Sequence, residues 1–184
     1  FFSKKIKQNF SSSELFDLLK SNRMLILYLI DTDIITIDEE ISNKICQFSQ
    51  GNEWSYKYFF YPEIKSFISE GERLNIESLI KEQNFNIIDQ FDENRRKGEN
   101  DYIISLFIRH DSVSELDAYL NRINLPYSSQ IRESIFESNS FLNKKRVSLI
   151  EYAAFYGSIQ VVKYLWLNQV DLTPSLWIHA IHSN

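Results

Sequence analysis

Apolar residues recur every three or four positions along most of the chain, and short polar stretches separate these groups. Such a period is typical of amphipathic α-helices. One group, Leu15, Leu18 and Leu19, follows the segment Ser11–Glu14 (SSSE), which has the spacing of a helix capping box. The 184 residues include only 4 glycines and 3 prolines, fewer than the many tight turns of a β-rich fold would need. The pattern therefore predicts an all-α fold.

The helical pattern is interrupted at residues 92–101 (DENRRKGEND), which carry no apolar side chain. Such a run is typical of a solvated loop, so we expect a polar loop or hinge at 92–101. It would separate divergent helical repeats at 1–91 from a second helical region at 102–184.

The segment Trp54–Pro62 (WSYKYFFYP) is dense in aromatic residues. Two readings are open: a core segment that buries much apolar area, or an aromatic recognition surface. The core reading is favoured, because aromatic side chains dominate buried area in folded domains.

A degenerate repeat runs through the sequence. Segment 161–172 (VVKYLWLNQVDL) aligns without gaps with 76–87 (IESLIKEQNFNI). Segments 118–125 (AYLNRINL) and 27–35 (LYLIDTDII) have the same form, an apolar helix end followed by a polar turn and aliphatic residues. Because a short helix pair cannot bury its apolar face alone, repeated pairs of this kind predict stacking.

The clearest unit is 148–165 (SLIEYAAFYGSIQVVKYL). Small side chains at Ala153 and Ala154 would let helices approach closely, and Gly157 would end the first helix with a positive φ. We expect the buried stripe of the second helix to consist of Ile159, Val162, Leu165 and Trp166.

This unit resembles an ankyrin repeat. Paired alanines, then Gly157, then Val161–Lys163 (VVK) and Leu165, and finally Asp171 follow the order and spacing of that family. Thr173–Pro174 and Ala180 resemble the start of a next unit, which would be incomplete. There are departures: Ser148–Glu151 is SLIE where the family usually has Thr-Pro-Leu-His, and Gln169 stands where a turn glycine is usual.

A wider resemblance covers nearly the whole chain. The chain is similar to the uncharacterised ankyrin-like proteins expanded in trichomonad protists, through the segments FYPEIK (60–65), RRKGEND (95–101), IRHDSV (108–113), IFESNSF (135–141) and LIEYAAFYGSIQ (149–160). The resemblance implies ankyrin-like helix-turn-helix repeats stacked as a short solenoid, and by analogy a protein-binding function.

Charge and composition exclude several classes of function. The formal net charge of −5 lacks the basic excess that nucleic-acid binding normally needs. Cys46 is the single cysteine and cannot form an internal disulfide. The longest apolar run, Met24–Ile30, is far below the roughly 20 residues of a membrane span. We therefore expect a cytoplasmic protein that binds neither nucleic acid nor membranes, with association to the cytoskeleton as a further option.

Signals for catalysis or cofactors are weak. His179 and His182 lie three apart and could face one metal, but neighbouring positions offer no third ligand, so packing histidines are favoured. His110–Asp111 sits at a turn, where the aspartate can accept backbone bonds; a catalytic dyad there has no partnered nucleophile. The sequence carries no phosphate-loop, dinucleotide or nucleophile-elbow motif. We expect a non-enzyme without metal or cofactor, and an enzyme with a dispersed site is the minor alternative.

The resemblance implies where a protein partner would bind: at hairpin tips and at the exposed end of each first helix. These places correspond to Arg109, His110, Lys144, Lys145, Val147, Phe155 and Tyr156. Phe155 and Tyr156 could instead pack against the neighbouring unit. We expect an interaction module with other proteins as partners, part of a larger ankyrin-repeat scaffold whose repeats continue in the parent chain. The alternative is a structural component of a large cytoskeletal or other assembly.

Overall fold

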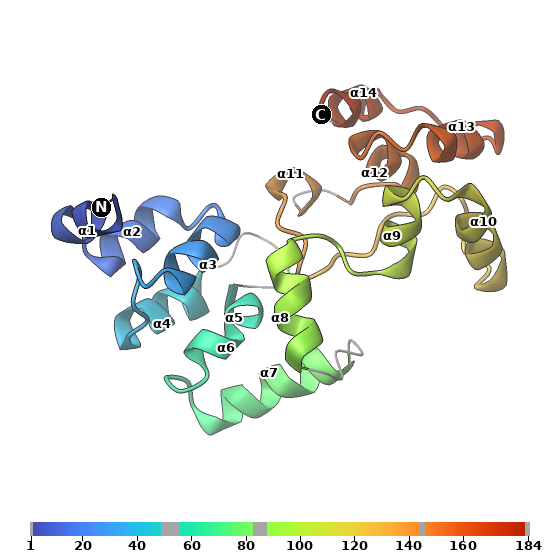
Figure 1. Cartoon of the computed structure of the whole chain (residues 1–184). Coiled ribbons are helices and arrows are strands. Elements are labelled where there is room, and N and C mark those ends of the chain that lie inside the picture. The colour runs from blue at the N-terminus through green and yellow to red at the C-terminus, as the bar shows by residue number, and fades with distance from the viewer. Residues whose placement is uncertain (1, 49–55, 83–87, 144–145, 183–184) are drawn as a thin grey trace. The chain divides into compact units, whose positions relative to one another are not determined.

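The structure is a computed structural model that describes residues 2–48, 56–82, 88–143 and 146–182 (Figure 1). Every regular element formed by these residues is a helix, which confirms the all-α class. None of the helices that they form is both long and apolar enough to cross a bilayer. The chain divides into two compact units, Phe1–Glu99 and Asn100–Asn184.

The first unit contains eight of the helices in the described ranges: α1 (Phe2–Asn9), α2 (Ser12–Leu19), α3 (Arg23–Asp31), α4 (Glu39–Gln47), α5 (Tyr56–Phe59), α6 (Tyr61–Ile64), α7 (Glu70–Glu82) and α8 (Ile88–Lys97). The predicted capping box is present at the start of α2. The Ser11 side chain accepts a bond from the Glu14 backbone N–H, and the Glu14 carboxylate accepts one from the Ser11 backbone N–H. Tyr56, Phe59 and Phe60 lie buried in the core of this unit. The aromatic segment therefore serves the core where it is described; Trp54 lies outside the described residues.

The expected polar loop at 92–101 is partly helical. Residues 92–97 form the last part of α8, and the boundary between the two units falls between Glu99 and Asn100. The helix persists because Arg95, only 2% exposed, forms a two-pronged ion pair with Glu63, with N–O distances of 2.6 and 2.9 Å. Asp92 also accepts a bond from Arg95, at 2.5 Å. Residues 92–97, which were predicted to be solvated, thus include the buried guanidinium of Arg95, whose charge Glu63 and Asp92 neutralise.

The second unit contains α9 (Ile103–Arg109), α10 (Val113–Arg122), α11 (Ser140–Asn143), α12 (Leu149–Phe155), α13 (Ile159–Leu167) and α14 (Pro174–Ile181). Two antiparallel pairs, α9 with α10 and α12 with α13, form its framework. In each pair the first helix is the one that comes earlier in the chain, α9 or α12. Helix α12 contacts both α9 and α14, and the second helix of its pair, α13, contacts α10 (Figure 1). First helices thus form one layer and second helices another, with a continuous apolar core between the pairs.

Five helix ends in the described residues close in the same way. In each, a residue with left-handed backbone donates its N–H to the carbonyl three residues back, and the next residue donates to the carbonyl five residues back. The left-handed residues are Asp33 (φ 57), Asp111 (φ 53), Asn124 (φ 53), Gly157 (φ 66) and Gln169 (φ 64). Gly157 ends its helix as predicted, and Gln169 also has a left-handed backbone, the conformation that glycine adopts most readily.

These closures explain the sequence repeat. The closing bonds join Ile34 to Leu29, Leu125 to Leu120 and Val170 to Leu165, at the ends of three of the four aligned segments. The corresponding end of the fourth segment, 76–87, lies outside the described residues. An apolar helix end, a polar left-handed residue and an aliphatic residue are therefore the parts of one backbone motif.

The buried stripe of α13 differs from the expected one. Val161 and Leu165 are fully buried, whereas Ile159 and Trp166 are 59% and 57% exposed. Seven of the nine residues of α13 (IQVVKYLWL) are apolar or aromatic, so its periodicity does not select one face. Contacts with α10 and α12 select the face of Val161, and the opposite apolar face stays uncovered.

Candidate protein-binding surface

The turn of the first helix pair is bonded to the second pair. Asp111, held in the left-handed region, accepts the N–H groups of Gln160 (3.1 Å) and Val161 (2.9 Å) at the start of α13. The N-cap residue Ser158 makes no side-chain cap bond within its own helix and instead donates its hydroxyl to the Ile108 carbonyl. Asp111, in the turn of the α9–α10 pair, thereby caps α13 of the following pair. This is the backbone-bonding role expected for it at the turn.

Arg109 is held inside the second unit by polar and aromatic contacts. Its Nη1 donates to the Asn100 carbonyl at 2.8 Å and to the Tyr152 hydroxyl at 3.1 Å. Its guanidinium also lies 5.8 Å from the centre of the Tyr156 ring. Arg109 is half-buried, so part of it reaches the surface, but its bonds serve the packing of α9 against α12.

The two tyrosines beside Arg109 lie in a desolvated environment. Their ring centres are 4.8 Å apart. Burial, reinforced by the nearby charge of Glu137, raises the pKa of Tyr152 to about 12. The same two causes raise the pKa of Tyr156 above its usual range. Both hydroxyls therefore stay protonated at physiological pH and act as neutral hydrogen-bonding groups.

Phe155 packs with residues of its own unit. Its ring is stacked with that of Phe141 at 6.1 Å, and the His182 ring at the end of α14 is 6.5 Å away. The His179 and His182 rings lie 4.6 and 4.7 Å from Phe141. These contacts give both histidines an aromatic packing role and leave Phe155 and Tyr156 half-buried within the unit.

The other expected contact residues fall in three different settings. Val147 is buried in the core cluster that also contains Leu149, so its side chain offers a partner no surface. The residue after it, Ser148, pairs with Gln130 in an isolated β-bridge. His110 is exposed at the turn after α9. Lys144 and Lys145 lie outside the described residues. The expected surface is therefore divided between packed and exposed side chains.

The segment Ser148–Glu151 joins the start of α12 to the start of α14. Ser148 and Glu151 form a second capping box, with the Ser148 N–H 2.9 Å from the Glu151 carboxylate. The other carboxylate oxygen accepts bonds from Thr173 (3.0 Å) and from the Ser175 hydroxyl. Burial opposes ionisation, but these hydrogen bonds outweigh it and lower the pKa of Glu151 to about 2. A charged residue thus connects the start of α12 to the start of α14.

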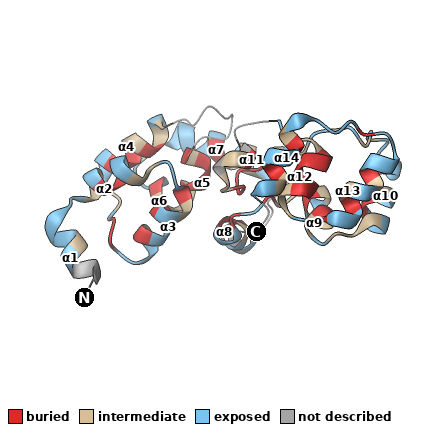
Figure 2. Ribbon diagram, turned by 90° about the horizontal axis from the view of Figure 1, so that it is seen from above, coloured by how far each residue is buried: buried red, intermediate tan, exposed pale blue. Residues whose placement is uncertain are grey.

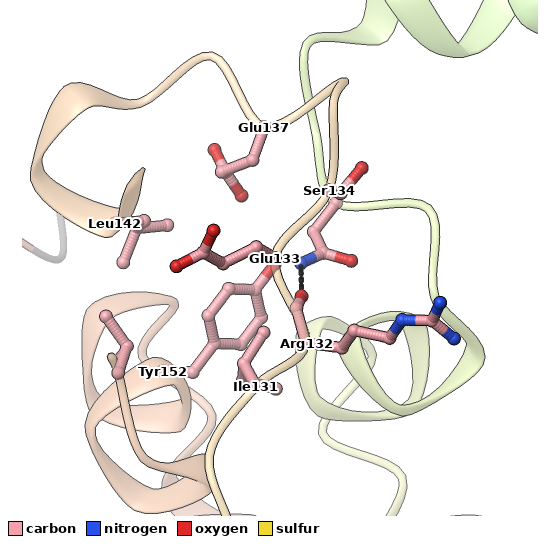
Figure 3. A pocket seen from close by; sticks show the side chains of 9 residues that line it. Ile131, Arg132, Glu133, Ser134, Glu137, Leu142 and Tyr152 are labelled. Atoms are coloured by element: carbon pink, nitrogen blue, oxygen red, sulfur yellow. Dashed lines mark hydrogen bonds between the residues drawn. The ribbon is translucent and has the colours of Figure 1, made fainter. Parts of the chain in front are cut away.

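A narrow cavity in the second unit is lined by both polar and apolar residues (Figure 3). Glu137, Leu142 and Tyr152 surround it, while Arg132 points away and its carbonyl accepts a bond from Asn100. Its volume of about 10 Å³ holds no more than about one water molecule. The cavity has no room for an organic substrate.

A larger apolar groove lies between α13 and α14. It has a volume of about 440 Å³, and its floor is formed by Ala154 and Gly157 at the end of α12. The walls are apolar and aromatic and include Ile159, Val162, Trp166, Leu172, Leu176 and Trp177. Lys163 is the charged residue among those that line it. Trp166 and Trp177 are 57% and 68% exposed, which leaves large aromatic surfaces open to solvent. Figure 2, in which the ribbon is coloured by burial, shows exposed stretches along both α13 and α14.

None of the predicted binding residues is among those that line this groove. A signal for it is present in the sequence, because α13 carries apolar residues on more than one face. A helix that is apolar all round is normally covered on both sides. Trp166, predicted to lie in the buried stripe, instead belongs to the second, exposed face.

Metal ligation and known relatives add no further constraint. In the described ranges no three His, Cys, Asp or Glu side chains come together as a metal site would require. Comparison with family models, with curated proteins and with solved structures finds no match.

Proposed function

We propose that this chain is a protein-binding module, and that the second unit carries the binding surface. The observation that supports this most directly is the apolar groove between α13 and α14, with its exposed tryptophans. Large exposed apolar patches are uncommon on isolated domains, and tryptophan is among the residues that contribute most to interface energy.

We further propose that the helix pairs are degenerate ankyrin-like repeats, arranged as a short solenoid. Support comes from the order of features in 149–170: paired alanines, the left-handed Gly157, α13 and the left-handed Gln169. The pair α9–α10 has no paired alanines but repeats the rest of the order, with Asp111 and Asn124 as the left-handed residues in the matching places. Asp111 accepts a backbone N–H bond from the start of α13, and Glu151 accepts a hydroxyl bond from Thr173 at the start of α14, so each pair is linked to the element that follows it.

The test of binding uses the purified chain as bait in native extract, followed by chemical cross-linking and recombinant production of each cross-linked protein. We expect at least one purified partner to bind the chain saturably. Double substitution Trp166→Ala and Trp177→Ala should weaken that binding at least about tenfold, the effect of removing two anchor residues. The control is Leu167→Ala, because Leu167 is 76% exposed on α13 but does not line the groove. Equal binding by all variants would overturn the assignment of the groove, and the lack of any saturable partner would overturn the function.

A further inference from the structure

The chain between α10 and α12 is closed into a loop by pairing at its base. The Ile131 N–H donates to the Val147 carbonyl at 2.8 Å. Gln130 and Ser148, one position further out, form an isolated antiparallel bridge. Residues 131–147, the closed loop, include three of the predicted binding residues. What attaches this loop to the helix pairs therefore bears on the surface that the second unit presents.

The narrow cavity of Figure 3 lies where the closed loop meets α12. Seven of its nine lining residues belong to the loop, and Tyr152 belongs to α12. Six of the nine are buried, namely Asn100, Ser134, Glu137, Leu142, Val147 and Tyr152. The volume of about 10 Å³ is enough for one water molecule and for no larger ligand.

The Tyr152 hydroxyl forms two hydrogen bonds with described residues and can form a third. It accepts a bond from Arg109 Nη1 at 3.1 Å and is hydrogen-bonded to the Tyr156 hydroxyl. A phenol hydroxyl donates once and accepts up to twice. Because Tyr152 is only 1% exposed and lines the cavity, a molecule inside the cavity is well placed to form the third bond.

Glu137 brings a carboxylate to the loop side of the same cavity (Figure 3). It is 3% exposed, and a buried carboxylate needs hydrogen bonds to stay ionised. One of its oxygens accepts the Asn139 N–H at 3.0 Å, and a carboxylate has about four acceptor positions. Half-buried Glu133 lines the cavity as well. The lining thus offers acceptors from the loop and a hydroxyl from α12, which suits a small molecule that donates two hydrogen bonds.

We propose that this cavity binds one water molecule, which joins the closed loop to α12. The water donates to the Glu137 carboxylate, forms a second bond with the Tyr152 hydroxyl and forms a third with Glu133. Three hydrogen bonds are typical of a buried water, and such a bridge is nearly as favourable as a direct bond. The site is separate from the groove between α13 and α14, so the inference does not depend on the proposed function.

The direct test is a crystal structure of the whole chain at a resolution that shows ordered water. We expect one density peak in the cavity, about 2.7–3.2 Å from a Glu137 carboxylate oxygen and from the Tyr152 hydroxyl. A cavity without density would overturn the proposal. Two carboxylates also suit a hard cation, so melting temperatures are compared in EDTA and in calcium chloride. Stabilisation by calcium that Glu137→Gln abolishes would show that a cation is the occupant, and would overturn the water.

A single substitution tests the same site in solution. Val147→Ile adds one methylene to the lining of the cavity. If a bonded water is present, the methylene expels it, and we expect the melting temperature to fall by about 4–8 °C, roughly the effect of losing one buried hydrogen bond in a small domain. A dry cavity would instead be filled, so an unchanged or higher melting temperature would overturn the proposal.

A double-mutant cycle distinguishes loss of the water from simple crowding. Tyr152→Phe removes one partner of the water, so Val147→Ile should lower the melting temperature less in this background than in the parent. Val170→Ile is the matched control, because Val170 is buried in the same core but does not line the cavity. Its effect should be equal in both backgrounds. Equal effects of Val147→Ile in the two backgrounds would overturn the bridge to Tyr152.

Discussion

Asp111 caps α13 through Val161: its Oδ1 lies 2.9 Å from the Val161 N–H, although the two residues belong to different helix pairs. The aspartate also has a left-handed backbone, with φ at 53°. One residue thus ends the first helix of one pair and begins the second helix of the next. Its backbone and its side chain can be tested separately.

Two substitutions of Asp111 should separate the contribution of its side-chain cap from that of its left-handed backbone. Asp111→Gly removes the cap and relieves the left-handed backbone, so we expect a loss of about 1 kcal/mol. Asp111→Ala removes the cap and keeps the strain, so it should cost about 1 kcal/mol more. Urea unfolding gives both values, and hydrogen exchange at Gln160 and Val161 reports the cap itself. Equal stability of the alanine and glycine variants would contradict a contribution from backbone strain.

The Glu151 carboxylate should make the second unit sensitive to acid. Its pKa is lowered from 4.5 to about 2 in the folded chain, so the ionised form stabilises the fold above pH 4.5. This contribution should fall as the pH decreases from about 4.5 to about 2. We expect Glu151→Gln to lose roughly 1–2 kcal/mol at pH 7 and to differ little from the parent at pH 2.

The measurement for Glu151 is the free energy of unfolding as a function of pH for the two proteins, with Glu115→Gln as the exposed control. Because the other carboxyls are common to both proteins, the difference curve isolates Glu151. A difference that stays constant from pH 7 to pH 2 would show that the carboxylate charge does not carry the effect.

Arg95 should be hard to replace in the first unit. Its two Nη atoms bond Glu63, Asp92 and the Phe59 carbonyl, the last at 3.2 Å. Arg95→Ala leaves the partly buried Glu63 without its partner and should cost about 3–5 kcal/mol. Arg95→Lys keeps the charge but cannot reproduce the fork, so it should recover only part of the loss.

Urea unfolding of the Arg95 variants is followed by circular dichroism. Lys97→Ala is the matched control, since Lys97 pairs with Glu93 on the exposed side of the same helix and should change stability by less than about 0.5 kcal/mol. Losses of similar size for Arg95→Ala and Lys97→Ala would contradict the buried ion pair.

Arg109 and His110 are neighbours that should respond differently. Arg109→Ala removes bonds to Asn100 and Tyr152 and should lower stability by about 1–3 kcal/mol. His110 is exposed, so His110→Ala should stay within about 0.5 kcal/mol. Thermal unfolding distinguishes them. An unchanged melting temperature for Arg109→Ala would contradict a stabilising role for its contacts.

Local chemistry was predictable from the sequence. The capping box of Ser11 and Glu14 and the helix end at Gly157 depend on residues within a few positions of each other. The form shared by the aligned segments was also visible, because in these segments an aliphatic residue directly follows the polar residue that ends the helix.

Features that depend on distant partners were not predictable. Arg95 reads as solvated until Glu63, 32 positions away, neutralises it. Val161 and Val162 are adjacent, yet only contacts with other helices decide that Val161 is the buried one. For the candidate surface, the prediction correctly put Phe155 and Tyr156 at the C-terminal end of α12. Their aromatic neighbours come from α11, α12 and the end of α14, and the sequence pattern does not show those contacts.

The left-handed helix ends also bear on the unfolded chain. Asp33, Asn124 and Gln169 restrict backbone motion in the denatured ensemble more than glycine would, so less conformational entropy is lost when their turns form. The same residues cost about 1 kcal/mol each in the native turn. Glycine substitution there changes both states at once, and the sign of the net effect shows which of the two costs is larger.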